Sequence, residues 1–232
     1  MKYSRNRYRV SLLFRMALLK TLWVNLRCLP IKQAYHLPIL IAKGVKIKDL
    51  HRGGVKIVDV KKLSFGSVLR IGFLHQHYFR RSVIDIKGTL ACKGNGVRQF
   101  AAGLTLIIRK DAYFEIGGNF SCEHNARIQV YKKLIIGASN MWAFDIIVMD
   151  TDAHLIYNDK GEMISLNKDV IFGDNVWLGC RNIVLKGAHI PDNCVLGAGG
   201  IITKSLDKSS AIYCGNKIIR EGICWSSEWN LG

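Results

Sequence analysis

The chain is short of proline, of paired cysteines and of long uncharged apolar runs. Three Pro in 232 residues exclude a collagen-like or proline-rich chain. The seven Cys include no Cys-x-x-Cys pair, which removes the clearest sequence signal for a cysteine metal site or a redox pair. The longest apolar candidate, residues 10–29, contains Arg15, Lys20 and Arg27, so it is a poor membrane-spanning helix. It carries no small-residue cleavage site of a signal peptide, and we expect a reduced, cytoplasmic protein.

Acidic residues are scarce in the first half of the chain only. Lys and Arg number 34 against 17 Asp and Glu, for a net charge of +17. Residues 1–115 hold 23 basic and 5 acidic residues, whereas residues 116–232 hold 11 and 12. Any long-range electrostatic attraction to an anionic partner would therefore come from residues 1–115. It contains no nucleic-acid recognition motif, so we expect no nucleic-acid partner.

Bulky apolar residues recur at every sixth position in the last third of the chain. They are Phe172, Leu178, Val184, Ile190, Leu196 and Ile202. Mostly smaller residues lie two positions before each of them, at Val170, Val176, Asn182, Ala188, Cys194 and Gly200. Neither a 3.6-residue helix nor a two-residue strand alternation has this period. It indicates a coil of short strands that stacks on itself at about 4.8 Å per turn; the alternative is a sandwich with evenly spaced strands.

The same period continues upstream with interruptions. Its positions are Ile116, Cys122 and Ile128, then after a two-residue slip Ile136, Trp142, Val148 and His154. Residues 155–168 break the pattern and are expected to form a loop. We expect a coiled domain over 44–206, preceded by a basic, partly helical segment over 1–43 and followed by a tail over 207–232. Cys122 and Cys194 fall at inward positions of the repeat and are expected in the core.

The first 50 residues carry 11 basic residues and one acidic residue, Asp49. Apolar residues at helical spacing predict a helix from about Val10 to Leu29, and Pro30 and Pro38 bound a short second element. A basic helix with an apolar face is typical of a membrane-surface anchor, and equally of a helix that packs on its own domain. Both interpretations remain open from the sequence.

The repeats resemble those of the hexapeptide-repeat acyltransferases. Within that family, Ile116 to Gly222 is similar to the sugar O-acetyltransferases, on motifs such as Trp177-Leu178-Gly179-Cys180 and Leu196-Gly197-Ala198-Gly199. The resemblance implies an all-β fold, a left-handed parallel β-helix, assembled as a homotrimer. It also implies an acetyl-CoA-dependent enzyme, without a metal, that acetylates a sugar hydroxyl of a surface glycan or its precursor.

The resemblance assigns roles to individual residues. His154, where the coil stops, matches the general base, and an imidazole can accept a proton near neutral pH. Asp152 or Asp150 would orient it, and we favour Asp152 without deciding between them. The residues assigned to coenzyme A are Cys180, Ala198, Thr203, Lys204, Lys217 and Arg220, although the Pro-Ala that usually precedes the last two is missing. Those assigned to the acceptor are Glu123, Asn125 and Trp142, and Trp142 either stacks on a sugar or fills a corner.

Other functions compete with this interpretation. An N-acetyltransferase of an amino sugar nucleotide and a serine O-acetyltransferase share the fold and the thioester. The zinc carbonic anhydrases of the same coil need two His five residues apart, and Asp159 stands where the second would be. A non-enzymatic scaffold that displays a basic surface to an anionic glycan or a membrane is the remaining alternative.

Overall fold

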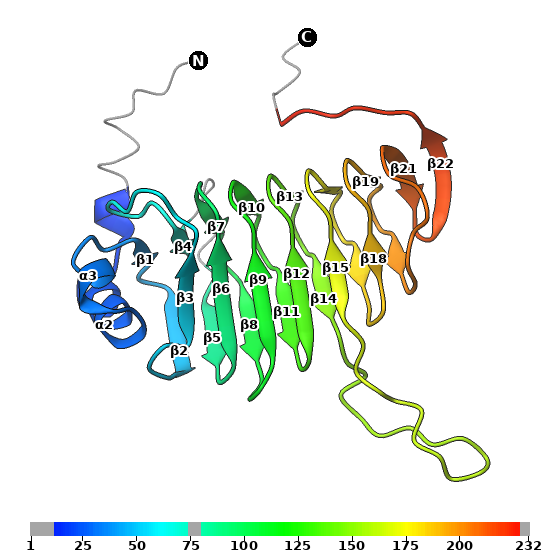
Figure 1. The fold of residues 1–232 in the computed structure, drawn as a ribbon, viewed down its shortest axis with the longest axis horizontal. Coiled ribbons are helices and arrows are strands. Elements are labelled where there is room, and N and C mark those ends of the chain that lie inside the picture. The colour runs from blue at the N-terminus through cyan, green and yellow to red at the C-terminus, as the bar shows by residue number, and fades with distance from the viewer. Residues whose placement is uncertain (1–11, 74–79, 228–232) are drawn as a thin grey trace.

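The computed structural model describes residues 12–73 and 80–227, and in this part the chain winds through three sheets in turn (Figure 1). Sheet 1 contains β1 (Ile39–Ile41), β4 (Leu69–Ile71), β7 (Arg98–Phe100), β10 (Phe120–Cys122), β13 (Met141–Trp142), β16 (Trp177–Leu178), β19 (Val195–Leu196), β21 (Ala211–Cys214) and β22 (Lys217–Glu221). Sheet 2 contains β2 (Val45–Leu50), β5 (Ser82–Ile86), β8 (Thr105–Ile108), β11 (Arg127–Val130), β14 (Ile147–Met149), β17 (Ile183–Val184) and β20 (Ile201–Ile202). Sheet 3 contains β3 (Val55–Val58), β6 (Thr89–Lys93), β9 (Tyr113–Ile116), β12 (Lys133–Ile136), β15 (Val170–Phe172) and β18 (His189–Ile190).

Neighbouring strands within each sheet are parallel, apart from the antiparallel pair of β21 and β22. In the regular coils Trp177 lies opposite Val195, so the chain returns to sheet 1 after 18 residues, or three sides of six. The bulky repeat positions from Phe172 to Ile202 are all buried, and so are the smaller residues two positions before them. The predicted fold class, a parallel β-helix of hexapeptide repeats with a short helical N-terminal segment, is confirmed.

The coils extend past both ends expected from the repeat. β1 pairs with β4 and therefore begins the first coil at Ile39 rather than at residue 44, and β21 adds a parallel strand beyond residue 206. The first coil takes 30 residues, because Ile39 lies opposite Leu69, and the second takes 29, because Leu69 lies opposite Arg98. Longer coils with irregular corners show no six-residue period, which explains the difference at the N-terminal end.

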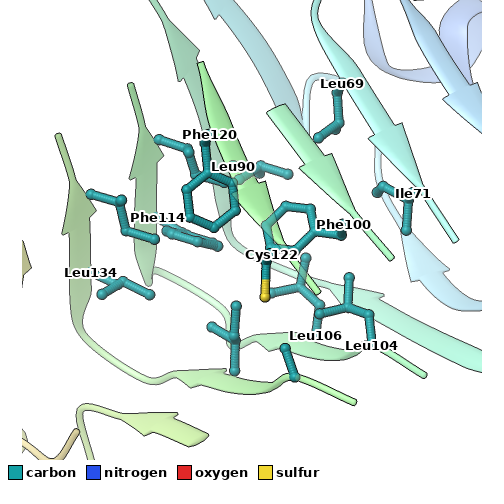
Figure 2. Packing of buried hydrophobic residues seen from close by; sticks show 14 of the residues in the cluster. Leu69, Ile71, Leu90, Phe100, Leu104, Leu106, Phe114, Phe120, Cys122 and Leu134 are labelled. Atoms are coloured by element: carbon teal, nitrogen blue, oxygen red, sulfur yellow. The ribbon is translucent and has the colours of Figure 1, made fainter. Parts of the chain in front are cut away.

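The core lies inside the prism and contains a column of aromatic rings. Phe100, Phe120 and Trp142 come from consecutive strands of sheet 1 and Phe172 comes from β15 of sheet 3, with ring centroids 5.1, 5.2 and 4.8 Å apart along this order. Figure 2 shows the first two of these rings beside Cys122 and Phe114. Such tilted and edge-on ring pairs stabilise a core beyond the area that they bury.

Four cysteines, Cys28, Cys92, Cys122 and Cys194, are buried, as predicted for the last two. Burial raises the pKa of the Cys92 thiol to about 11, and it raises the pKa of Cys122 further. These thiols behave as apolar core side chains and not as nucleophiles.

The helices Leu18–Cys28 and Ile31–Ala34 lie at the N-terminal end of the prism (Figure 1). α2 (Leu18–Cys28) packs against β1, and α3 (Ile31–Ala34) begins directly after Pro30, as the two prolines predict. Among the described residues no helix is both long enough and apolar enough to cross a membrane.

Candidate active site

Eight of the predicted site residues lie at two corners of the prism, on either side of sheet 2. Glu123, Asn125, Cys180 and Ala198 follow strands of sheet 1 and form the 1–2 corner. Asp152, His154, Thr203 and Lys204 follow strands of sheet 2 and form the 2–3 corner. The straight part of a side is about four residues long, as in β11, and at ~3.3 Å each this puts the two corners roughly 13 Å apart. One chain alone therefore does not bring all of these residues together.

His154 lies at the base of a long loop, residues 150–169, that leaves the coil between β14 and β15 (Figure 1). Its side chain is exposed, and its ring makes no hydrogen bond or ion pair with any other described residue. The preceding residue, Ala153, has a φ of +62°, and its N–H donates to Thr151 Oγ1 at 2.9 Å. This tight turn directs the chain outward just before the histidine.

Asp150, the first residue of the loop, is held in place by the neighbouring coil. Its buried carboxylate accepts the backbone N–H groups of Tyr131, Lys132 and Lys133 at 2.7–2.8 Å. Burial raises the pKa of Asp150, and the three N–H donors oppose this rise. Because both carboxylate oxygens are taken up by the neighbouring coil, Asp150 is poorly placed to orient His154.

Asp152 forms an ion pair with Lys186, a residue to which sequence reasoning assigned no role. Lys186 lies at the 2–3 corner of the next coil, after β17, and its Nζ donates to Asp152 Oδ2 and to the Leu166 carbonyl at 3.2 Å. One ammonium group thus joins the first and last turns of the loop to the coil beside it. The pairing spans 34 positions, so it becomes visible only once the coils are in register.

A second ion pair closes the other end of the loop. Lys132 Nζ lies 2.9 Å from Asp169 Oδ1, just before β15. The base of the loop is therefore held by Asp150, by Lys186 and by Lys132, while apolar side chains farther out remain exposed. These exposed side chains are Leu155, Ile156, Tyr157, Met163, Ile164 and Leu166.

The residues assigned to coenzyme A gather toward the C-terminal end of the prism. Cys180 and Ala198 occupy successive turns of the 1–2 corner, where the Gly199 N–H donates to the Cys180 carbonyl at 2.8 Å. Asn216, in the turn between β21 and β22, donates from Nδ2 to Thr203 Oγ1 at 2.8 Å and accepts from Thr203 N–H at 3.1 Å.

These contacts place Lys217, the neighbour of Asn216, beside Thr203 and Lys204. Arg220 lies farther along β22, opposite Ile212. Lys204, Lys217 and Arg220 are all exposed. Asn216 was not predicted as a site residue. Nothing in the sequence around it indicates its hydrogen bonds with Thr203, which is 13 residues earlier.

A groove of about 790 Å³ runs over the outer face of sheet 1. Glu123 lines it, together with Arg70, Gln99, Ser121 and Trp177 among others. At its 1–2 edge, the rings of His124 and Phe144 stack with centroids 5.1 Å apart and planes 2° apart. Polar groups beside flat apolar faces suit a sugar ring, which presents both hydroxyl and C–H surfaces.

The other two acceptor residues serve different roles in this chain. Trp142 is fully buried in the aromatic column, so its ring has no face left for a ligand, and the prediction that it binds substrate is not supported. Asn125 has a φ of +65°, and its Nδ2 donates to Asp145 Oδ1 at 2.8 Å, which ties two turns of the corner together. Glu123 and Trp142 both line the groove, but only Glu123 is partly exposed, since Trp142 is fully buried.

The C-terminal segment folds back to the edge of this groove. Trp225 Nε1 donates to the Asn175 carbonyl at 2.7 Å, and its ring lies 5.9 Å from the ring of Trp177. Within the described residues no three His, Cys, Asp or Glu side chains form a group that could hold a metal ion.

Curated relatives of this chain carry acetyltransferase names. A polysialic acid O-acetyltransferase of Neisseria meningitidis is 31% identical over 126 residues, which cover 50% of this chain and 58% of that protein. A galactoside O-acetyltransferase of Escherichia coli (strain K12) is 30% identical over 112 residues, 46% of this chain and 53% of that protein. The chain thus spans little more than half the length of the curated relatives it matches. These names confirm the resemblance seen in the sequence, although no family model matches the chain.

Two solved structures show a looser likeness. A polysialic acid O-acetyltransferase, OatWY, matches with a TM-score of 0.48 at 26% identity, over 81% of this chain and 90% of that one. A galactoside acetyltransferase in complex with coenzyme A matches with a TM-score of 0.39 at 19% identity, over 87% and 77% of the two chains.

Proposed function

We propose that this protein is an acetyl-CoA-dependent O-acetyltransferase that acetylates a sugar hydroxyl of a surface glycan, such as a capsule, O-antigen or exopolysaccharide, or of its precursor. The observation that carries the proposal is the position of His154. Its ring is exposed at the base of the loop between β14 and β15, next to the Lys186–Asp152 ion pair. Curated relatives of the chain are named polysialic acid and galactoside O-acetyltransferases.

The proposed reaction is a direct transfer. His154 accepts the proton of the acceptor hydroxyl while the hydroxyl oxygen attacks the thioester carbonyl carbon. Backbone N–H groups near the site stabilise the oxyanion of the tetrahedral intermediate. The C–S bond then breaks, and the thiolate of coenzyme A takes up the proton that His154 carried. The step needs no cysteine nucleophile, because the acceptor hydroxyl attacks the thioester directly.

For the donor, we propose that Lys204, Lys217 and Arg220 bind the phosphate groups of coenzyme A. Their exposure at one end of the prism and the Thr203–Asn216 contact support this assignment, since they keep the cations within one region of the surface. Cys180 and Ala198 would line the path of the pantetheine arm.

For the acceptor, we propose the groove on sheet 1, with Glu123 as a hydrogen-bond acceptor for sugar hydroxyls and the stacked His124 and Phe144 as a flat wall. Asn125 would act indirectly, by shaping the corner through Asp145.

We propose that three copies assemble and that each active site forms between two of them. Two observations support this: the candidate residues divide between corners on opposite sides of sheet 2, and the loop that carries His154 leaves six large apolar side chains exposed. A second copy that covers the loop would bring its own 1–2 corner toward His154 and would bury that apolar surface.

We place the protein in the cytoplasm, in reversible contact with the inner face of the membrane. A lipid-linked glycan precursor would be found there, and the basic first half of the chain would be attracted to anionic lipid.

The test is transfer of labelled acetyl groups from acetyl-CoA to a panel of sugars, nucleotide sugars and polysialic acid by the purified protein. We expect ester formation on at least one glycan hydroxyl and release of free coenzyme A. Acetylation of an amino group only would favour the N-acetyltransferase alternative, and failure to bind coenzyme A would favour the non-enzymatic scaffold.

A further inference from the structure

α2 has two different faces, and within residues 12–73 and 80–227 only one of them packs against the rest of the protein. The inner face carries Thr21, Val24, Asn25 and Cys28, which are buried against the first coil. Asn25 Nδ2 donates to the Ile39 carbonyl at 2.8 Å, and Asn25 Oδ1 accepts from the Ile39 N–H at 3.2 Å. Thr21 Oγ1 accepts from the Ile41 N–H at 3.1 Å.

These contacts close the open edge of sheet 1. β4 pairs with only one side of β1, so the backbone groups on its other side need partners, and the side chains of α2 supply them. The inner face therefore accounts for the packing of the helix on its own domain. It also holds the helix at a fixed rotation.

The outer face is a continuous apolar stripe that the described residues of the chain leave uncovered. Residues at helical spacing i and i+4 share a face, which groups Leu18, Leu22 and Leu26 with Leu19 and Trp23. Leu19 is 81% exposed, Leu26 58% and Trp23 47%. We refer to these five residues as the α2 stripe. Exposing a continuous row of apolar side chains to water is unfavourable, and such patches mark interaction sites, so we infer that the stripe binds a partner.

Cations border the stripe along one side. Lys20 Nζ donates to the Val45 carbonyl at 2.7 Å, and Arg27 Nε donates to the Leu50 carbonyl at 3.4 Å, so α2 lies along β2 from one end to the other. Lys46 and Lys48 are exposed on β2 itself. From residue 12 to residue 52 the chain has eight Lys or Arg and one acidic residue, Asp49.

A groove opens beside the C-terminal end of the helix. It has a volume of about 400 Å³ and is lined by Leu26 and Ile31 together with Arg52, among others. Apolar walls next to a guanidinium group suit a molecule with an acyl chain and an anionic head group.

We propose that the α2 stripe docks on the surface of an anionic lipid bilayer, with the five apolar side chains in the interface and the lysines of β2 against the lipid phosphates. The proposal names the part of the molecule that makes the membrane contact suggested above, and it is independent of acetyl transfer. The charge of the border argues for lipid: a second copy would bring the same cations to the contact, whereas an anionic bilayer neutralises them.

Point substitutions test the stripe better than removal of the helix, because a deletion would uncover β1. We compare the full-length protein with a Leu19→Gln/Trp23→Gln variant in flotation with vesicles of phosphatidylcholine and phosphatidylglycerol (3:1), and with vesicles of phosphatidylcholine alone. Ile219→Gln is the matched control, since Ile219 is an exposed apolar residue on β22 at the opposite end of the prism (Figure 1).

We expect the unchanged protein and the Ile219→Gln variant to float with anionic vesicles at low salt and to release them at 0.5 M salt. The double variant should bind at least tenfold more weakly and keep the same melting temperature. A Lys46→Gln/Lys48→Gln variant should bind more weakly and with less dependence on salt.

The proposal is overturned if the unchanged protein fails to float, or if the double variant floats equally well. It is also overturned if the double variant changes the subunit number in sedimentation, because the stripe would then be a protein interface. Acetyl transfer to a soluble sugar is measured on the same variants and should not change, which separates failure of this proposal from failure of the proposed enzyme.

Discussion

Replacing Lys186 by Met removes the cation that holds both ends of the loop carrying His154. The ammonium group donates to Asp152 Oδ2 and to the Leu166 carbonyl, and the side chains of Lys186 and Asp152 are 19% and 30% exposed. Met keeps most of the apolar stem of the side chain. The perturbation is therefore loss of the charge and of two hydrogen bonds, with little change in packing.

The size of the effect follows from this partial burial. A fully exposed pair contributes up to ~1 kcal/mol, and removal of one partner from a fully buried pair costs ~3–5 kcal/mol. For a pair between these limits, we expect the free energy of unfolding to fall by about 1–2 kcal/mol. A displacement of the base by about 1 Å is enough to lower turnover by up to ~10²-fold, so we expect kcat to fall by about 10- to 100-fold.

The assay is steady-state acetyl transfer together with thermal unfolding, for Lys186→Met, Lys186→Arg and Lys160→Met. Lys160→Met makes the same change of charge at the exposed outer part of the loop and should leave kcat within twofold. Lys186→Arg keeps a cation and should recover part of the activity. In an Asp152→Asn background the Lys186→Met effect should shrink, because the partner is already neutral. If Lys186→Met keeps full activity, the contacts of Lys186 with Asp152 and Leu166 do not position His154, and the reasoning is refuted.

Three further outcomes are expected. Asp150→Ala leaves three backbone N–H groups of the preceding coil without their acceptor and should lower the free energy of unfolding by ~2–4 kcal/mol in chemical denaturation; a change below 0.5 kcal/mol would contradict the role assigned to Asp150. Neutralising Lys204 or Arg220 should weaken coenzyme A binding in calorimetry and reduce its salt dependence, and unchanged affinity in both variants would show that the C-terminal turn does not reach the donor. Iodoacetamide at pH 8 should label Cys214 and Cys224 in the native protein, followed slowly by Cys180, and labelling of Cys92 or Cys122 before unfolding would contradict their burial.

The six-residue period was sufficient to predict the architecture of the regular coils, because the same steric demand recurs at every inward position. Phe172, Leu178 and Val184 are buried as the pattern requires. The first coils were harder to predict, since their 29- and 30-residue lengths carry corner segments without a period.

The candidate site was predictable in part. The place of His154, at the last repeat position before the break, could be found from the sequence alone, and so could the corners that hold Cys180 and Ala198. The partner of Asp152 could not be predicted, because Lys186 lies one coil away, 34 positions along the chain, and no local motif links the two residues. For Trp142 the sequence left two interpretations open, stacking on a sugar or filling a corner. Its place in the six-residue period is an inward one, like that of Cys122, and the aromatic column puts its ring in the core.

Turnover of the His154→Ala variant tests the central claim most directly. The variant is compared with the unchanged protein for acetyl transfer, and for coenzyme A binding by calorimetry. Because His154 is exposed and makes no contact that holds the described part of the fold, stability should stay the same. The account predicts a fall in kcat of ~10²-fold or more with donor affinity nearly unchanged. A loss of less than tenfold, on a glycan that the unchanged protein acetylates, would contradict the assignment of His154 as the base.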